Sequence, residues 1–243
     1  MVIDGYVTLG TERETVYAVD DLIRDLNTAS VEKAVITADD REIAVFNRQG
    51  NARILKESKK NPDRLIPSCT VNPWYGSEAV SEFRRAADEG AQMLVLNPTL
   101  QGFLINDDLA DDVIDAAKEY GIPVYVHTGP HLYGAPWQLV DCALRHPDVS
   151  FIMGHSGATD YWNDVQHSAT FTDNVYLEGS FARPFSFKNY LAGTDVWRGI
   201  MGSAAPRNNL CFEWEQYRKE LGGSEFASVF GDTLASILPG KGQ

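Results

Sequence analysis

Cysteine and long hydrophobic runs are both scarce in this sequence. The 243 residues include three cysteines, Cys69, Cys142 and Cys211, which lie far apart and form no CxxC motif. Such an odd and sparse set argues against a disulfide framework and favours a reducing compartment. No apolar run approaches the roughly 20 residues that a membrane-spanning helix needs. Because residues 1–8 already have a strand pattern rather than that of a leader peptide, we expect a cytoplasmic protein.

Positive charge is also in short supply. The chain has 34 acidic residues against 21 lysines and arginines, which gives a formal net charge of −13. That balance argues against nucleic acid and anionic membranes as partners, because both would repel the protein. Hydrophobic residues make up 44% of the chain, enough to bury a core without help from a disulfide or a metal. We therefore expect a small-molecule ligand as the partner.

Residues 121–157 are the most informative stretch. They open with GIPVYVHTG and close with SFIMGHSG, and each end is an apolar run followed by a histidine, a small residue and a glycine. Residues 137–145 between them have the apolar spacing of an amphipathic helix. The stretch predicts two parallel strands that end at His127 and His155. We expect both imidazoles to face one pocket, because α/β folds place their chemistry at these strand ends.

Strand and helix patterns alternate along the whole chain, and residues 41–59 predict one long helix. Besides the two strands of the central stretch, strands are predicted at residues 2–7, 33–37, 64–71, 92–96, 174–178 and, more weakly, 199–202. These apolar runs are typical of a parallel sheet whose outer face is covered by helices. A doubly wound open sheet is the competing fold, but residues 4–10 lack the spacing of a GxGxxG turn. We predict an α/β fold, a single (β/α)8 TIM barrel over residues 1–243.

Five segments carry a resemblance to a known family. They are NPDRLIPSCTVNP at 61–73, GIPVYVH at 121–127, MGHSG at 153–157, MGSAAP at 201–206 and FGDTLASIL at 230–238. In their order and spacing they resemble the amidohydrolase superfamily, in the branch of small metal-dependent hydrolases and decarboxylases that includes aminocarboxymuconate-semialdehyde decarboxylase. The resemblance implies a TIM barrel of amidohydrolase type, a divalent metal at its mouth and a homodimer.

The same resemblance implies a set of metal ligands that this sequence has largely lost. The family places a His-x-His pair on the first strand, a histidine on the fifth and an aspartate on the eighth, with a water-activating histidine on the sixth. Here the corresponding residues are Tyr6, Thr8, His127, Ala204 and His155, of which only the histidines match. A catalytic zinc usually needs about three protein ligands, and without a metal no hydroxide forms at neutral pH. We therefore expect no cofactor, with a small organic ligand bound at the mouth or hydrolysed without metal.

The residues expected to act in such a site follow from their places at strand ends. His127, His155 and Tyr6 are the catalytic candidates, with one imidazole as a base toward water. Tyr6 could equally fill the volume that the metal once occupied. The metal-free lactonases of the pyrone-dicarboxylate type are similar in working without metal, although they keep the aspartate that Ala204 replaces.

Other mouth residues are expected to contact a ligand. The candidates are His131, Asn97, Trp137, Glu178 and Arg183. Arg183 can pair with a ligand carboxylate, and Trp137 suits a flat organic molecule, although either is also common at protein contacts.

Two alternatives stay open. Glu178 could join His127 and His155 in a rearranged site, because two imidazoles and a carboxylate can hold zinc or manganese. The protein would then be a metal-dependent hydrolase or carbon–carbon lyase. The other alternative is a non-catalytic, oligomeric scaffold subunit.

Overall fold

A parallel eight-stranded sheet forms the centre of the molecule. The computed structural model describes residues 1–12, 14–129, 133–158 and 160–240. The strands are β1 (Ile3–Thr8), β4 (Lys33–Thr37), β5 (Leu65–Thr70), β6 (Met93–Leu96), β7 (Val124–His127), β8 (Phe151–Gly154), β9 (Val175–Glu178) and β10 (Gly199–Ile200), paired in that order. Just beyond β10, Ala205 pairs with Val7 of β1 and so brings the two ends of the sheet together. The structure confirms the predicted (β/α)8 barrel.

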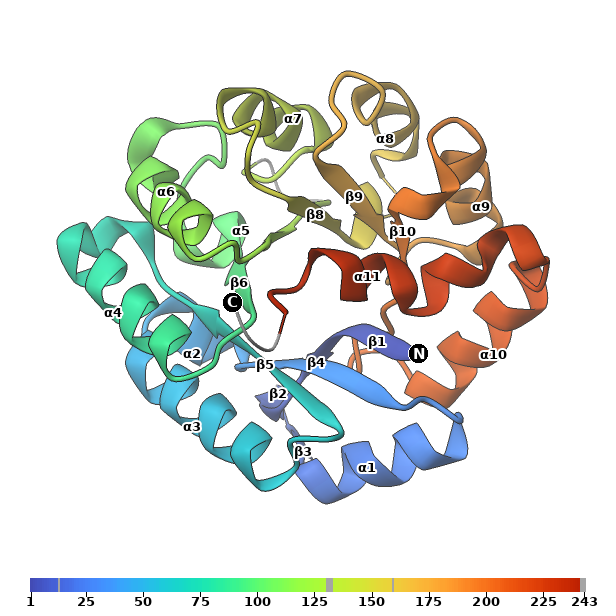
Figure 1. Ribbon diagram of the computed structural model, residues 1–243, viewed down its shortest axis with the longest axis horizontal. Helices are drawn as coiled ribbons and strands as arrows, with labels where there is room; N and C mark the ends of the chain where they lie inside the picture. Colours follow the sequence, from blue (N-terminus) through green and yellow to red (C-terminus); the bar gives the residue numbers. More distant parts are fainter. Residues whose placement is uncertain (13, 130–132, 159, 241–243) are drawn as a thin grey trace.

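Helices surround the barrel (Figure 1). They are α1 (Val19–Thr28), α2 (Asp40–Ala44), α3 (Asn47–Lys60), α4 (Ser77–Asp88), α5 (Pro98–Gln101), α6 (Asp111–Glu119), α7 (Pro136–Arg145), α8 (Trp162–Ser168), α9 (Pro184–Ala192), α10 (Leu210–Glu220) and α11 (Asp232–Ile237). In the ranges that the structure describes, no helix is both long and apolar enough to cross a membrane. Short 3-10 turns connect several of them, among them η3 (His155–Gly157) and η5 (Ser224–Phe230).

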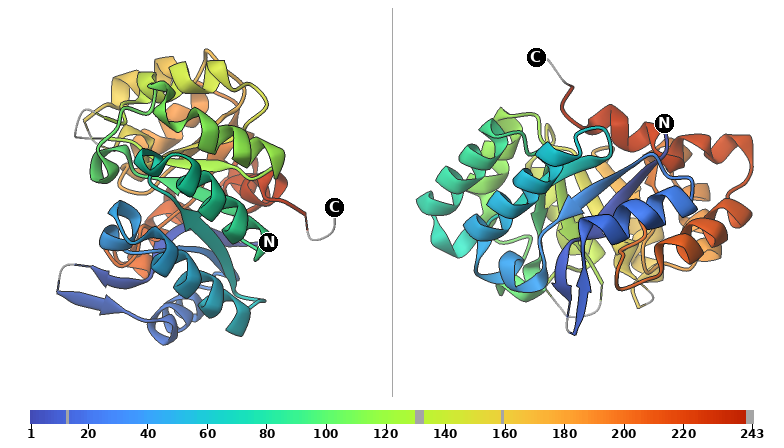
Figure 2. Two further views of the ribbon diagram at one scale, coloured as in Figure 1. Left: turned by 90° about the vertical axis from the view of Figure 1, so that its left-hand side faces the viewer. Right: turned by 90° about the horizontal axis from the view of Figure 1, so that it is seen from below.

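The two ends of the barrel are built differently. At the end where the strands begin, α11 lies across the opening (Figure 1). Its Leu234 belongs to the apolar cluster of the barrel interior. At the other end, a hairpin of β2 (Gly10–Glu12) and β3 (Thr15–Tyr17) projects away from the barrel (Figure 2). The sequence analysis did not predict this hairpin. The open end, where the strands finish, is therefore the mouth.

Side chains on the two faces of the sheet form separate apolar layers. One large cluster lies between the sheet and the helices, and a smaller one fills the barrel interior. The interior cluster includes Tyr6 and Tyr125, whose rings stack with their centroids 4.6 Å apart. Both tyrosine rings also contact His127 and His155 edge-on, so the histidines of the mouth pack on these two rings.

A buried carboxylate helps to hold β1 against the last strand. Asp4 is fully buried and accepts hydrogen bonds from the backbone of Ser203 at 2.9 Å and from the indole of Trp214 at 2.9 Å. Burial raises the pKa of Asp4, and these hydrogen bonds oppose that rise. Beside it, Gly5 has no side chain because an added Cβ would lie 2.8 Å from Cγ2 of Ile200. Together these features allow the strands to meet closely, which fixes Tyr6 at the mouth.

Candidate active site at the barrel mouth

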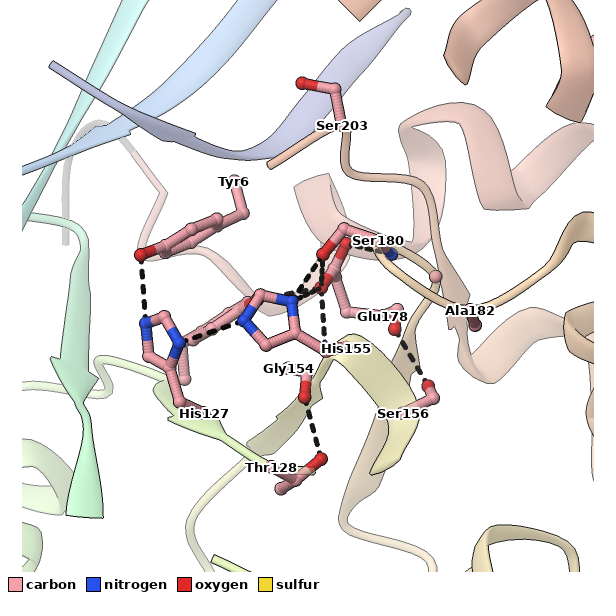
Figure 3. A network of polar contacts seen from close by, with 12 residues as sticks. Tyr6, His127, Thr128, Gly154, His155, Ser156, Glu178, Ser180, Ala182 and Ser203 are labelled. Atoms are coloured by element: carbon pink, nitrogen blue, oxygen red, sulfur yellow. Dashed lines mark hydrogen bonds and ion pairs between the residues drawn. The ribbon is translucent and has the colours of Figure 1, made fainter. Parts of the chain in front are cut away.

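Two histidines meet where β7 and β8 end. The parallel register pairs His127 with Gly154, so that His155 follows directly beside it. Nε2 of His155 faces Nδ1 of His127 (Figure 3), at a distance of 2.9 Å. Both residues are more than nine-tenths buried. The structure brings the two imidazoles together as the sequence predicted.

The contacts continue on both sides of this pair. The hydroxyl of Tyr6 lies 2.9 Å from Nε2 of His127. On the other side, Nδ1 of His155 lies 2.7 Å from Oγ of Ser180, which donates to Oε2 of Glu178 at 2.7 Å. These five side chains form an unbroken chain of hydrogen bonds from β1 to β9, here called the mouth relay (Figure 3). Ser180 was missed in the sequence because nothing in a lone serine after a strand indicates a partner.

Glu178 anchors the far end of the mouth relay. The residue is fully buried, and its Oε2 accepts from the backbone of His155 at 2.9 Å, from the hydroxyl of Tyr125 at 2.7 Å and from Ser180. Its Oε1 accepts from the backbone of Ser180 at 2.8 Å. Burial raises the pKa of Glu178, and the four donors oppose the rise because they stabilise the carboxylate. Glu178 therefore lies beneath the histidines, and not at the cavity where a ligand or metal contact was expected.

The backbone of the mouth is strained. Of the six non-glycine residues with left-handed φ in the described ranges, five follow the ends of β8, β9 and β10. They are His155 at 66°, Ser156 at 41°, Ala158 at 50°, Phe181 at 60° and Ala204 at 54°. Each such residue costs about 1–3 kcal/mol of conformational free energy. Such residues persist only where the surrounding structure holds them in place, and they cluster at active sites. This clustering supports the choice of this end of the barrel as the candidate site.

Burial keeps both imidazoles uncharged at neutral pH. It lowers the pKa of His127 well below the ordinary value of 6.5, and the neighbouring His155 and Arg207 lower it further. Burial and the positive charge of Arg207 also lower the pKa of His155. Neutral imidazoles each carry one donor and one acceptor, as an internal relay requires.

These lowered pKa values give a test by titration. As the pH falls below about 6.5, the unfolded chain binds protons that the folded protein does not, so His127 and His155 make the fold less stable in acid. We expect the imidazole NMR signals of both residues to stay those of the neutral form from pH 7.5 to pH 5, and to titrate near 6.5 once urea unfolds the chain. If either histidine titrated near pH 6.5 in the folded protein, its pKa would not be lowered by burial and this account would be wrong.

A cavity of about 400 Å³ opens above the relay. It is lined by Asp40, Asn97, Thr99, Leu100, His127, Thr128, Gly129, His155, Ala158, Phe181 and Arg207. Arg207 contributes the permanent positive charge of this lining and forms an ion pair with Asp40 at 2.5 Å. The sequence analysis missed Arg207, although its place directly after the SAAP turn that follows the eighth strand could have indicated it. The ring of Phe181 lies edge-on to His155 with a centroid separation of 5.0 Å.

The other predicted ligand contacts fall in different places. Asn97 lines the cavity, but its Oδ1 accepts from the backbone of Leu100 at 3.0 Å and caps α5. Trp137 packs on Phe171 with ring centroids 5.1 Å apart and does not line the cavity. Arg183, at the start of α9, lines a neighbouring cavity of about 450 Å³. His131 lies outside the described residues.

The donor set at the mouth does not fit a divalent metal. Both ring nitrogens of His127 are engaged, one with Tyr6 and one with His155. Ala204 has no donor, and both oxygens of Glu178 already accept from protein groups. No three histidine, cysteine or acidic side chains come together as a possible metal site anywhere in the part of the chain that is described. A metal of the usual kind would need ligands that these positions do not supply.

Comparison with known proteins gives a consistent family and fold. A family model described as Amidohydrolase matches residues 16–214. Among solved structures, 5-carboxyvanillate decarboxylase from Sphingomonas paucimobilis is 13% identical with a TM-score of 0.78, covering 97% of this chain and 98% of that one. The 2,6-dihydroxybenzoate decarboxylase from Rhizobium is 11% identical with a TM-score of 0.77, covering 97% and 98%. No curated protein matches the sequence.

A third similar structure contains a metal. It is 5-carboxyvanillate decarboxylase from Novosphingobium aromaticivorans, complexed with manganese and 4-hydroxy-3-methoxy-5-nitrobenzoic acid. It is 15% identical to this chain with a TM-score of 0.79, and the match covers 98% of this chain and 95% of that one. At this identity the likeness establishes a shared fold only. Whether this chain can bind a metal has to be judged from its own residues.

Proposed function

This chain belongs to the amidohydrolase family, and from that premise we propose that it binds a small organic acid at the barrel mouth and acts on it without a divalent metal. The observation that carries the proposal is the mouth relay, in which a buried phenol is hydrogen-bonded to the first of two neutral imidazoles that line a cavity of about 400 Å³. Phenol and imidazole can move a proton at neutral pH, which is the work that a metal-bound hydroxide would otherwise do.

The chemistry of the cavity favours a carboxylate as part of the ligand. Arg207 faces the cavity beside Asp40, with which it is paired. A ligand carboxylate can replace Asp40 as the partner of the guanidinium, because both groups offer two oxygens in the same geometry. The named substrates of the similar decarboxylases, 5-carboxyvanillate and 2,6-dihydroxybenzoate, are also aromatic carboxylic acids. This ring class fits a cavity that Phe181 and Leu100 border.

The relay suggests a path for proton transfer between the ligand, Tyr6 and His127. In this proposal the Tyr6 hydroxyl passes its proton to Nε2 of His127, and the Tyr6 oxygen takes a proton from a ligand or water that reaches it past His127, the residue that lines the cavity. Nε2 of His155 accepts the Nδ1 proton of His127 as a hydrogen bond, which partly offsets the destabilisation that burial and Arg207 impose on a protonated His127. Arg207 supplies the positive charge that stabilises an oxyanion forming on the ligand.

The experiment that tests this function uses protein freed of metal by a chelator. Binding and turnover of 2,6-dihydroxybenzoate, 5-carboxyvanillate and 2-pyrone-4,6-dicarboxylate are followed by calorimetry and chromatography. We expect at least one acid to bind equally well with and without chelator, and Arg207→Gln to weaken that binding by about tenfold or more. Arg183→Gln is the matched control, because Arg183 lines the neighbouring cavity. The proposal would be contradicted if binding were lost on adding the chelator, or if Arg207→Gln left the affinity unchanged.

A second candidate function is favoured by one observation. Because a similar decarboxylase is complexed with manganese, this chain could be a metal-dependent decarboxylase or hydrolase. Its site would have to break the hydrogen bond between His127 and His155 and recruit a carboxylate that the present arrangement holds elsewhere. Activity that appears only on adding manganese would establish this candidate and exclude the first. Homodimerisation and the scaffold role both stay predictions.

A further inference from the structure

The acceptor at the end of the mouth relay has a consequence for every hydrogen bond along it. We propose that Glu178 and Ser180 are positioning residues that make the relay donate in one direction only, from Tyr6 toward Glu178, and so fix the tautomers of both histidines. The chemical use of this direction rests on the proposed function, whereas the direction itself follows from the contacts once Glu178 is ionised and both imidazoles are neutral.

The direction is set at Glu178. An ionised carboxylate can only accept, and Glu178 accepts from two backbone N–H groups, from Tyr125 and from Ser180. The hydroxyl of Ser180 has one proton, which it gives to Glu178 at 2.7 Å. Its oxygen is then left as an acceptor. The contact of 2.7 Å between Ser180 and Nδ1 of His155 therefore requires the proton to lie on Nδ1.

The two histidines pass this constraint along. A neutral imidazole carries one N–H, so a proton on Nδ1 of His155 leaves its Nε2 as an acceptor. His127 must then donate from Nδ1 across the 2.9 Å contact, which leaves its own Nε2 as the acceptor for Tyr6. Both imidazoles are thus held with the proton on Nδ1. Without Glu178, a chain that donates in the opposite direction would satisfy His127, His155 and Tyr6 equally well.

The fixed tautomer gives His127 its chemical role. A base that receives a proton from Tyr6 needs its lone pair on Nε2, and the opposite tautomer would place a hydrogen there instead. The arrangement matches the general logic of a triad, in which a third group holds an imidazole in the required tautomer. Here the third group acts through two intermediates, because Ser180 and His155 lie between Glu178 and His127.

The tautomers can be read directly. In full-length protein labelled with ¹⁵N-histidine, long-range ¹H–¹⁵N spectra at pH 7.5 distinguish a protonated ring nitrogen from an unprotonated one. We expect Nε2 to be unprotonated and Nδ1 to carry the proton in both His127 and His155. In Glu178→Gln the amide can donate to Ser180, so we expect both histidines to shift toward the Nε2–H form. Ser180→Ala removes the acceptor of Nδ1 in His155 and should shift the same signals, even if Glu178→Gln does not fold.

A neighbouring serine provides the matched control. Ser156 is fully buried and its hydroxyl donates to the backbone carbonyl of Glu178 at 2.8 Å, but it lies outside the relay. Ser156→Ala should leave both tautomers unchanged. The inference is overturned if either wild-type histidine carries its proton on Nε2, or if the tautomers in Ser180→Ala equal those of the wild type.

The same experiment separates this inference from the proposed function. If the tautomers behave as expected but no organic acid is turned over, the positioning role stands and the proposed function fails. Where turnover is measurable, Ser180→Ala should lower kcat with little change in KM, because Ser180 does not line the cavity. A rise in KM at constant kcat would overturn the positioning role.

Discussion

Replacing Glu178 with alanine is expected to lower the free energy of unfolding by about 3–5 kcal/mol, the range seen when one partner of a buried charged network is removed. The carboxylate accepts four hydrogen bonds from groups of buried residues. Alanine would leave these donors unpaired and would leave a void beside Tyr125. Urea unfolding followed by circular dichroism measures the change.

The control for this substitution is an acidic residue of the same type at the surface. Glu89→Ala removes a glutamate whose side chain is 43% exposed and whose partners are surface ion pairs. Such pairs are typically worth at most about 1 kcal/mol, so we expect a correspondingly small change. An effect of Glu178→Ala no greater than that of Glu89→Ala would show that Glu178 does not anchor the mouth.

Replacing His127 with alanine is expected to reduce turnover of the organic acid by about 10²–10⁴-fold, the usual contribution of a positioned acid–base group. His127 is the one residue of the relay in contact with both Tyr6 and His155, so its loss separates the phenol from the rest. Binding should weaken far less, because Arg207 remains in the cavity. Initial rates and calorimetric binding of the same acid measure the two effects.

His146→Ala serves as the control for His127. His146 ends α7 and contacts Asp111 at 3.1 Å on the outside of the barrel. We expect this variant to retain the wild-type rate. Equal losses of rate in the two variants would point to a general loss of structure rather than to the chemistry of the mouth.

The barrel could be predicted from the sequence because its strands are apolar runs with clear ends. Residues 33–37 and 92–96 were predicted as strands and occur as β4 and β6. The position of His127 beside His155 followed from the parallel order of β7 and β8. One helix boundary was mispredicted, because it depends on tertiary packing. Residues 41–59 were predicted as one helix, but the structure has α2 and α3, because the chain leaves the helical conformation at Val45.

The sequence indicated four of the five residues of the mouth relay, but not how they contact one another. Tyr6, His127 and His155 could be selected from their places at strand ends. Ser180 could not, because its role depends on a contact of 2.7 Å with a histidine 25 positions earlier in the chain. Glu178 was selected for the opposite reason, since a carboxylate at a strand end suggests a ligand, whereas the structure turns it toward buried donors. Side-chain direction at a strand end depends on packing that a sequence pattern does not contain.

Calorimetric titration of Mn²⁺ and Zn²⁺ into chelator-treated protein, with the metal content of the purified protein measured in parallel, tests most directly whether this mouth works without a metal. We expect far less than one equivalent of metal in the purified protein and no binding that differs between the wild type and His127→Ala. One tightly bound equivalent that disappears in His127→Ala would show that the imidazoles serve a metal, and the metal-free relay would then be wrong.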